Sequence, residues 1–200
     1  MTALAPSPES GSSAQGVRWE LNELYAGPDD PTLGEDQRVA LEEAEAFAAE
    51  YRDHVARLDA PALARAASRL EALQARAYRP LVYAHLLFSG DTAQPRHGAL
   101  LQAARERHTA IQERLLFFTL EWQRVPAERA AALLSDSTLA RHRHWLERAR
   151  ETTPYTLSEP EERILAVKAN TGEQAFQRLF DELIGSLRCT LEAPDAAPRE

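Results

Sequence analysis

The chain has 200 residues, with 23 basic and 31 acidic side chains and a formal net charge of −8. That length allows one or two domains with a core, and the acidic balance argues against a nucleic-acid partner, because phosphate contacts need a basic surface. The single cysteine, Cys189, excludes a disulfide scaffold, and no apolar run approaches a membrane span. The 36 Ala and 27 Leu residues favour an all-α fold, an antiparallel helical bundle.

The N-terminal residues 1–16 are mostly Ser, Pro, Gly and Ala, which predicts a disordered tail, because such residues cannot offset the entropy of ordering. They lack the basic start and apolar centre of a signal peptide, so the expected compartment is the cytoplasm. The ordered chain is expected to begin at residues 17–27, with a short turn or helix lying on the core. Its apolar residues are Trp19, Leu21, Leu24 and Tyr25.

Apolar residues at steps of three and four predict a first long helix over residues 33–58. Asp59 and Pro61 are expected to start the second helix, as its cap and first-turn residue. Pro80 is expected to kink or break that helix, because proline has no amide donor. The apolar residues 81–88 that follow predict a segment buried on most sides.

The third predicted helix has the clearest pattern, a heptad seam that Pro126 ends, and such a seam is typical of long antiparallel helix packing. Its positions are Leu101, Ala104, His108, Ile111, Leu115, Phe118, Trp122 and Val125. Shorter helices are predicted near 126–134 and 137–149.

Ser158 and Glu161 have the spacing of a capping box, which predicts the start of a further helix that closes at residues 170–172. A last helix is predicted near 173–188. Residues 193–200 are expected to form a short polar tail.

No catalytic, cofactor-binding or metal-binding residue is assigned from these motifs. Zinc peptidases carry His-Glu-x-x-His on a helix, but no histidine here is followed by glutamate. Glu50 and His54 have the wrong spacing for a di-iron bundle, and glycine-rich phosphate loops are missing from the sequence. Cys189 is interpreted as an inert, half-buried residue, because a nucleophile needs a positioned base.

The histidines are expected to be structural. His108 lies on the seam and is predicted to be packed or hydrogen-bonded in the core, with a ligand role as the alternative. His85 is expected to be a satisfied interior side chain, and His97 to be exposed at a helix start. His142 and His144 lie about 200° apart on a helix and are expected to be solvated or interhelical.

Two charged features remain. Glu121 is expected to be half-buried and paired with an arginine, with a general-base role as the alternative. The basic stretch 141–150 is expected to be a solvated helix face, with a peptide carboxylate or an acidic partner as the alternative ligand. The ratio of 22 Arg to one Lys is attributed to compositional bias, so no arginine is singled out.

Six segments, taken in their order along the chain, carry a resemblance to a known family. They are WELNELYAGPDDP (19–31), AEAFAAEYRDHVARL (44–58), YRPLVYAHLLFSGDT (78–92), LLFFTLEWQRVP (115–126), ARHRHWLERARETTPYTLSEPEERILAVKANTG (140–172) and AFQRLFDELIGSLRCTLE (175–192). In this order they resemble the N-terminal region of oligoendopeptidase F-type enzymes, zinc metallopeptidases of the M3 family. The resemblance covers roughly residues 17–192.

The resemblance implies that residues 17–192 form an N-terminal helical lobe. In that family the lobe packs over a second helical lobe, and oligopeptides bind in the deep channel between the two. Zinc is held there by the two His of His-Glu-x-x-His and a downstream Glu, and the motif Glu is the general base. None of these residues is in this sequence, so zinc is implied only for the full-length enzyme and the chain alone is expected to be inactive.

The implied partners are therefore the missing C-terminal catalytic lobe and, in the full enzyme, an oligopeptide substrate. Three origins stay open: a piece of a full peptidase, a truncated product without activity, or a stand-alone helical module that binds peptides or a partner. A scaffold bundle with chance similarity is a further alternative. If a lobe is missing, apolar surface should be exposed, and the candidates are Phe117, Phe118, Trp122 and residues 81–88.

Overall fold

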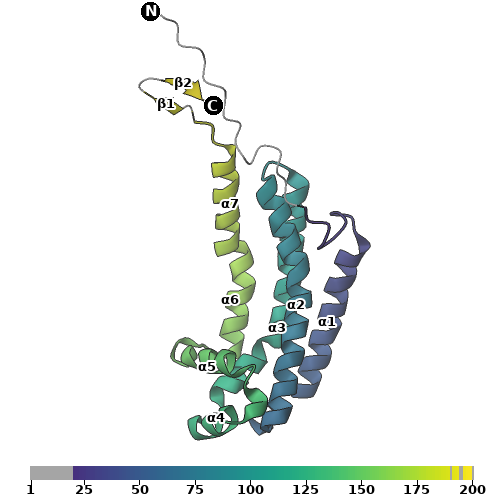
Figure 1. Ribbon diagram of the computed structural model, residues 1–200, viewed down its shortest axis with the longest axis vertical. Helices are drawn as coiled ribbons and strands as arrows, with labels where there is room; N and C mark the ends of the chain where they lie inside the picture. The colour runs from purple at the N-terminus through teal and green to yellow at the C-terminus, as the bar shows by residue number, and fades with distance from the viewer. Residues whose placement is uncertain (1–19, 190, 194–195, 200) are drawn as a thin grey trace, which may run out of the picture.

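The computed structural model describes residues 20–189, 191–193 and 196–199, so the predicted tail 1–16 and Trp19 lie outside the described residues. Helices dominate the described part, which confirms the all-α class (Figure 1). The α-helices are α1 (Pro31–Tyr51), α2 (Ala60–Gly90), α3 (Pro95–Arg124), α4 (Ala127–Leu134), α5 (Arg143–Glu151), α6 (Glu159–Thr171) and α7 (Glu173–Ser186). Short 3-10 helices lie between them: η1 (Val55–Arg57), η2 (Ser137–Leu139) and η3 (Thr153–Tyr155).

A short strand pair near the C-terminus is an addition to the predicted elements. Strand β1 (Leu191–Ala193) pairs antiparallel with β2 (Ala196–Arg199), and Leu191 lies opposite Arg199. The described residues of the expected polar tail thus pair with the residues that precede them. The sequence gives no sign of this pairing, because alanine and proline are poor strand formers.

The first three helices pack side by side as an antiparallel bundle (Figure 1). Many core positions hold alanine, which lets the helices approach closely, and phenylalanine fills the remaining space. The rings of Phe47 and Phe118, for example, lie 5.5 Å apart across α1 and α3. Buried members of this core include Ala40, Ala44, Phe47, Leu63, Ala66, Leu70, Leu73, Ala77, Ile111, Leu115, Phe117 and Phe118.

Aspartate caps start α1 and α2. The Asp59 carboxylate accepts a hydrogen bond from the Ala62 amide at 2.8 Å, with Pro61 in the first turn, as the sequence predicts. Asp30 does the same for the Thr32 amide at 2.9 Å. These caps satisfy amide donors that have no partner inside the helix.

The predicted turn before α1 is confirmed for its described residues. Tyr25 is buried together with Leu33 and Tyr83, and its hydroxyl donates to the Asp36 carboxylate at 2.7 Å. Burial is the main cause that raises the pKa of Tyr25, and the Asp36 carboxylate adds to it. The guanidinium of Arg79 lies 4.7 Å from the ring centre and ties this turn to α2.

Two predicted helix boundaries are wrong. The helix expected over 33–58 ends at Tyr51, because Asp53 takes a positive φ of 65° that a continuing helix does not allow. Pro80 was expected to kink or break the second helix; the break does not occur, and α2 runs through it to Gly90. Pro80 is itself buried, and burial of Ala77 and Tyr83 on either side outweighs the one lost backbone hydrogen bond.

The seam of α3 is confirmed, since its predicted positions are buried except for the half-buried His108. Below the bundle, α4 and α5 form a foot (Figure 1). The helix expected over 137–149 is split into η2 and α5. The Trp122 indole joins the foot to α3 by donating to the Leu146 carbonyl at 2.8 Å.

From the foot, α6 and α7 run along the bundle toward the α2–α3 turn (Figure 1). The capping box is confirmed, because the Ser158 amide donates to the Glu161 carboxylate at 2.9 Å. Gly172 separates the two helices, and a Cβ there would lie 3.1 Å from the Lys168 carbonyl oxygen. None of the helices in the described ranges is both long and apolar enough to cross a membrane.

Candidate functional site

The helix α6 is fastened to the bundle by polar contacts at its two ends. At its start, Arg52 forms an ion pair with Glu159 at 2.7 Å. At its end, the buried Asn170 accepts a hydrogen bond from the Thr109 hydroxyl at 3.2 Å. Asn170 is the one buried side chain of α6, so little apolar area holds this helix to α3.

The helix α7 turns its polar side toward the bundle. The Gln174 carbonyl accepts a hydrogen bond from the Arg105 guanidinium at 3.3 Å. Near the other end, a Cβ on Gly185 would lie only 2.5 Å from the Thr92 hydroxyl oxygen, so the backbone approaches the α2–α3 turn closely. Burial and the nearby charge of Arg178 lower the pKa of Arg105, which places charged residues of α7 on the bundle side.

The opposite side of α7 is apolar and faces outward. Its residues recur at steps of three and four, which puts them on one side of a helix. Each keeps between 49 and 72 % of its accessible surface exposed, and no residue of α7 is buried. We call this surface the α7 face: Phe176, Leu179, Phe180, Leu183, Ile184 and Leu187. An amphipathic helix in a globular protein normally turns its apolar side inward, so α7 has the reverse orientation.

Exposed apolar surface was expected, but at other residues. Phe117, Phe118 and Trp122 are buried between the bundle and the foot. Within 81–88, Tyr83, Ala84 and Phe88 are buried too. The exposed apolar residues cluster instead on α7, on α6 and just before α6: besides the α7 face they include Tyr155, Leu157, Ile164, Leu165 and Val167.

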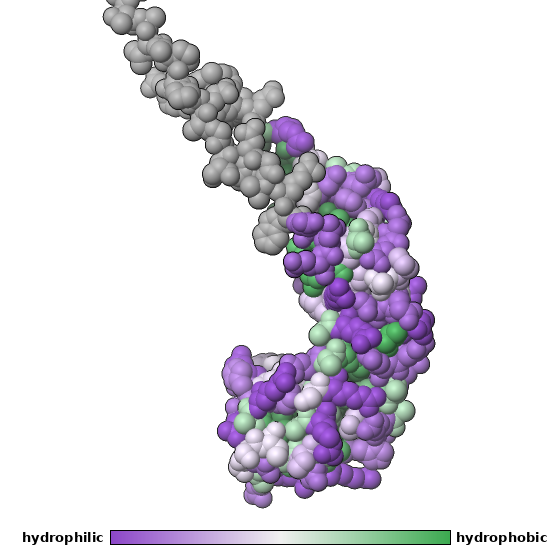
Figure 2. All heavy atoms as spheres, turned by 45° about the vertical axis from the view of Figure 1, so that its right-hand side comes forward, coloured by the Kyte–Doolittle hydropathy of each residue, from purple (hydrophilic) through white to green (hydrophobic). Residues whose placement is uncertain are grey.

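A groove follows α2 between the foot and the start of α7. Three hollows of about 280, 540 and 400 Å³ lie along it, and neighbouring hollows share Gln74 and Tyr78. Figure 2 shows the molecule hollowed on one side above the foot. We call this surface the α2 groove; its lining includes Leu70, Gln74, Tyr78, Val82, His85, Leu86, His108, Gln112, Trp145 and Gln174.

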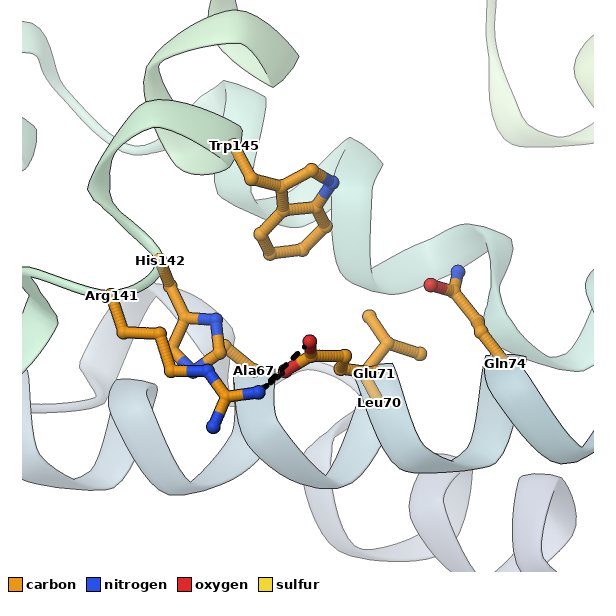
Figure 3. Close-up of a pocket in the computed structure, with 7 residues that line it drawn as sticks. All are labelled: Ala67, Leu70, Glu71, Gln74, Arg141, His142 and Trp145. Carbon is orange, nitrogen blue, oxygen red and sulfur yellow. Dashed lines mark hydrogen bonds and ion pairs between the residues drawn. The ribbon is translucent and has the colours of Figure 1, made fainter.

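The end of the groove at the foot is shown in Figure 3. Arg141 pairs with Glu71 at 2.9 Å and bridges from the foot to α2. The indole of Trp145 stacks on Phe118 with an interplanar angle of 14° and leaves part of its other surface exposed. This end therefore combines one ion pair with one exposed aromatic ring.

His108 lies in the middle of the groove. The amide nitrogen of Gln112 is 3.2 Å from the His108 Nε2, and the exposed ring of Tyr78 meets the imidazole edge-on at 5.2 Å. Loss of solvent lowers the pKa of His108 below its usual range, so the neutral imidazole is favoured. The predicted hydrogen-bonded role is confirmed, although the side chain is half-buried.

The other histidines lie apart from one another. His142 is buried, and its Nε2 lies 2.9 Å from the Ser68 hydroxyl of α2, which confirms the predicted interhelical role. His144 is exposed, which confirms the predicted solvated role. His85 was expected in the interior but is exposed at the groove, because its turn of α2 faces the hollow. His97 was expected to be exposed but is partly buried, with its Nδ1 3.3 Å from the Asp91 carbonyl.

Glu121 has a role that its sequence does not reveal. Its carboxylate accepts hydrogen bonds from the backbone amides of Asp53 at 2.7 Å and Val55 at 3.2 Å. The predicted arginine partner is therefore wrong, because the Glu121 carboxylate binds two backbone amides in the turn after α1. No local pattern signals a contact between residues this far apart in the chain.

The basic stretch 141–150 is spread over several partners. Arg150 donates to the Trp122 carbonyl at 2.8 Å and Arg143 to the Leu134 carbonyl at 2.8 Å, so both hold helix ends together. Arg148 pairs with Glu151 on the exposed side of α5. The predicted solvated helix face is therefore confirmed for Arg148, whereas Arg143 and Arg150 bind backbone carbonyls of neighbouring helices.

Among the described residues, no group of three or more His, Cys, Asp or Glu side chains is placed to hold a metal ion. Glu50 contacts Arg69, and only its backbone carbonyl lies near His54. Cys189 is exposed rather than half-buried. The described side chains therefore do not fit a zinc site.

Comparisons with known proteins confirm the predicted resemblance over part of the chain. Residues 121–188 match the family model described as Oligopeptidase F, the N-terminal region of the M3 peptidases. The match runs from the end of α3 through the foot to the end of α7. No curated protein and no solved structure matches the chain. Over residues 17–120 the resemblance stays a prediction.

Proposed function

We propose that the chain is the N-terminal helical lobe, residues 17–192, of an M3-like zinc oligoendopeptidase, the family whose model its residues 121–188 match. The observation that carries the proposal is the outward α7 face, which lies inside the matched segment. A helix with its apolar side exposed needs a covering partner. In the full enzyme, that partner is the C-terminal catalytic lobe.

The α2 groove supports a further part of this proposal. It offers aromatic surface from Tyr78 and Trp145, and amide groups from Gln74, Gln112 and Gln174. Amide side chains can both donate to and accept from a peptide backbone, and aromatic rings provide apolar contact. We assign this groove to the wall of the channel that holds an oligopeptide substrate.

The chemistry itself is assigned to the catalytic lobe. Zinc, as the family implies, would be held by residues outside this chain, so the lobe contributes binding surface and no acid, base or metal ligand. The proposed compartment is the cytoplasm. A second candidate function, a stand-alone module that binds peptides without catalysis, is favoured by the groove, because described residues of this chain line all three of its hollows.

The purified chain, supplied with zinc, is expected to show no hydrolysis of an internally quenched oligopeptide above the blank rate. The physical reason is the lack of a metal site among the described side chains. Fluorescence release over time measures the rate, and a full-length M3 peptidase serves as the positive control. Turnover by the pure chain that a chelator abolishes would contradict the proposal.

A further inference from the structure

We propose that Arg105 binds the C-terminal carboxylate of an oligopeptide, and that the hollow beside Arg105 takes the apolar side chain of the last residue. This hollow is the one of about 400 Å³ in the α2 groove, and we call it the terminal hollow. The proposal rests on the proposed function, because it concerns one end of the groove that we assign to the substrate channel. It adds to that function the direction of the bound peptide and a preference for its last residue.

The terminal hollow lies at the end of the α2 groove that is farther from the foot. It shares Tyr78 with the middle hollow, and Glu173 and Gln174 of the first turn of α7 form part of its wall. The start of α7 contacts α3 here through the Gln174 carbonyl, and α7 approaches the α2–α3 turn again at Gly185 (Figure 1). Because α7 lies against the bundle at this end, we expect an extended chain that follows the groove from the foot to end in the terminal hollow.

Arg105 is a half-buried cation that has no carboxylate partner among the described residues. Every ion pair in the described part of the chain uses an arginine, but none uses Arg105. A guanidinium has five N–H donors, and the hydrogen bond that Arg105 makes within the described residues goes to the Gln174 carbonyl at 3.3 Å. Burial lowers the pKa of Arg105, because the charge has lost part of its solvation. A ligand carboxylate supplies the missing counter-ion and can accept two parallel hydrogen bonds from the guanidinium.

The other charges around the terminal hollow are few and mostly exposed. His85 and Glu173 line the hollow with Arg105, and both are exposed. Glu173 forms no ion pair with Arg105; the charges that affect the pKa of Arg105 are those of Arg178, which lowers it, and Asp181, which raises it. A ligand carboxylate would therefore meet one half-buried cation and one exposed carboxylate, whose repulsion is weakened by solvent and salt.

The apolar part of the lining explains why the ligand is the end of a peptide. Leu81, Val82 and Leu86 of α2 line the terminal hollow and are half-buried, so each keeps some apolar surface that a ligand can cover. The volume of about 400 Å³ is within the range of small-ligand pockets. A C-terminal residue carries its carboxylate and its side chain on the same Cα, so it can reach Arg105 and the apolar lining together. The side chain of an internal Asp or Glu brings the carboxylate without an apolar group beside it.

Titration of the isotope-labelled 200-residue chain with three N-acetylated pentapeptides, followed by NMR shifts of the backbone amides, tests the proposal. The first peptide has four alanines and a last leucine with a free carboxylate. The second is its C-terminal amide, and the third is that amide with a central glutamate. The free carboxylate is expected to bind about tenfold more tightly than either amide, because it alone pairs with Arg105 at the end of the groove. The shift changes are expected at His85, Arg105 and Gln174.

Variants of the chain separate the role of Arg105 from that of charge in general. Arg105→Gln keeps a donor for the Gln174 carbonyl and is expected to abolish the preference for the free carboxylate over the amide. The matched control Arg107→Gln removes an exposed arginine of the same helix that does not line the terminal hollow, and is expected to leave the preference unchanged. Glu173→Gln removes the repelling carboxylate and is expected to tighten binding of the free-carboxylate peptide about twofold. A last serine in place of leucine is expected to weaken binding several-fold and to keep the carboxylate preference.

Several outcomes would overturn the proposal. They are no shift changes at millimolar peptide, equal affinities for the acid and its amide, a carboxylate preference that persists in Arg105→Gln, or tighter binding of the glutamate peptide, which would place an internal acidic side chain in the terminal hollow. Circular dichroism of each variant checks that helix content is retained. Failure here leaves the peptidase proposal intact, because that proposal fails only on hydrolysis by the chain or on the downstream gene sequence.

Discussion

Trp122→Ala is expected to lower the free energy of unfolding by about 3–5 kcal/mol, the cost typical of removing a buried aromatic side chain. Trp122 is almost fully buried where α3 meets the foot, and its indole donates to the Leu146 carbonyl at 2.8 Å. The guanidinium carbon of Arg150 lies 5.4 Å from its ring centre. Truncation removes the packing and leaves the carbonyl without its donor, so α5 should separate from α3 first.

Chemical denaturation followed by circular dichroism measures this loss. Trp145→Ala is the matched control, because Trp145 is a tryptophan of the same foot whose ring is partly exposed. Its stacking on Phe118 is expected to contribute about 1 kcal/mol. Equal losses for the two variants would contradict the assignment of Trp122 as the residue that holds the foot to the bundle.

Glu121→Ala is expected to cost about 1–3 kcal/mol, although the side chain is one carboxylate on a helix surface. Its oxygens accept hydrogen bonds from the amides of Asp53 and Val55, which follow the end of α1. Without the acceptor, these amides lose their partner and the positive φ of Asp53 is no longer held. The turn between α1 and α2 is therefore expected to loosen.

The same denaturation experiment tests Glu121, with hydrogen exchange at residues 52–58 as a local readout. The control Glu147→Ala removes an exposed glutamate from α5 and is expected to change stability by less than about 0.5 kcal/mol. Glu121→Gln keeps one oxygen acceptor and is expected to lose less than Glu121→Ala. A cost for Glu121→Ala no larger than that of the control would show that the carboxylate does not hold the turn.

The elements that the sequence predicts correctly are those whose structure is decided by local chemistry. The caps at Asp59 and Ser158 act within one helical turn, so the residues themselves reveal them. The seam of α3 is long enough for its period to be unambiguous. The family resemblance depended on the order of several such segments, and the match over residues 121–188 confirms it there.

Errors arose where contacts between distant residues decide the structure. The end of α1 depends on Glu121, which is far away in the sequence. Pro80 lies inside a continuous helix because buried neighbours outweigh its missing donor. Exposed apolar surface was expected, but on residues other than those of the α7 face. The spacing of apolar residues shows that a helix has an apolar side, but it does not show whether that side faces the core or the solvent. The exposure of the α7 face and the close approach of Gly185 to Thr92 show that the apolar side of α7 faces outward.

The most direct test of the peptidase proposal is the DNA sequence downstream of codon 200. If the chain is the N-terminal lobe of an M3-like enzyme, the downstream sequence should encode His-Glu-x-x-His, either in the same frame or after a frameshift. That motif supplies two zinc ligands and the general base, which the described residues of this lobe do not provide. A downstream sequence without the motif in any forward frame would contradict the proposal and favour the stand-alone binding module.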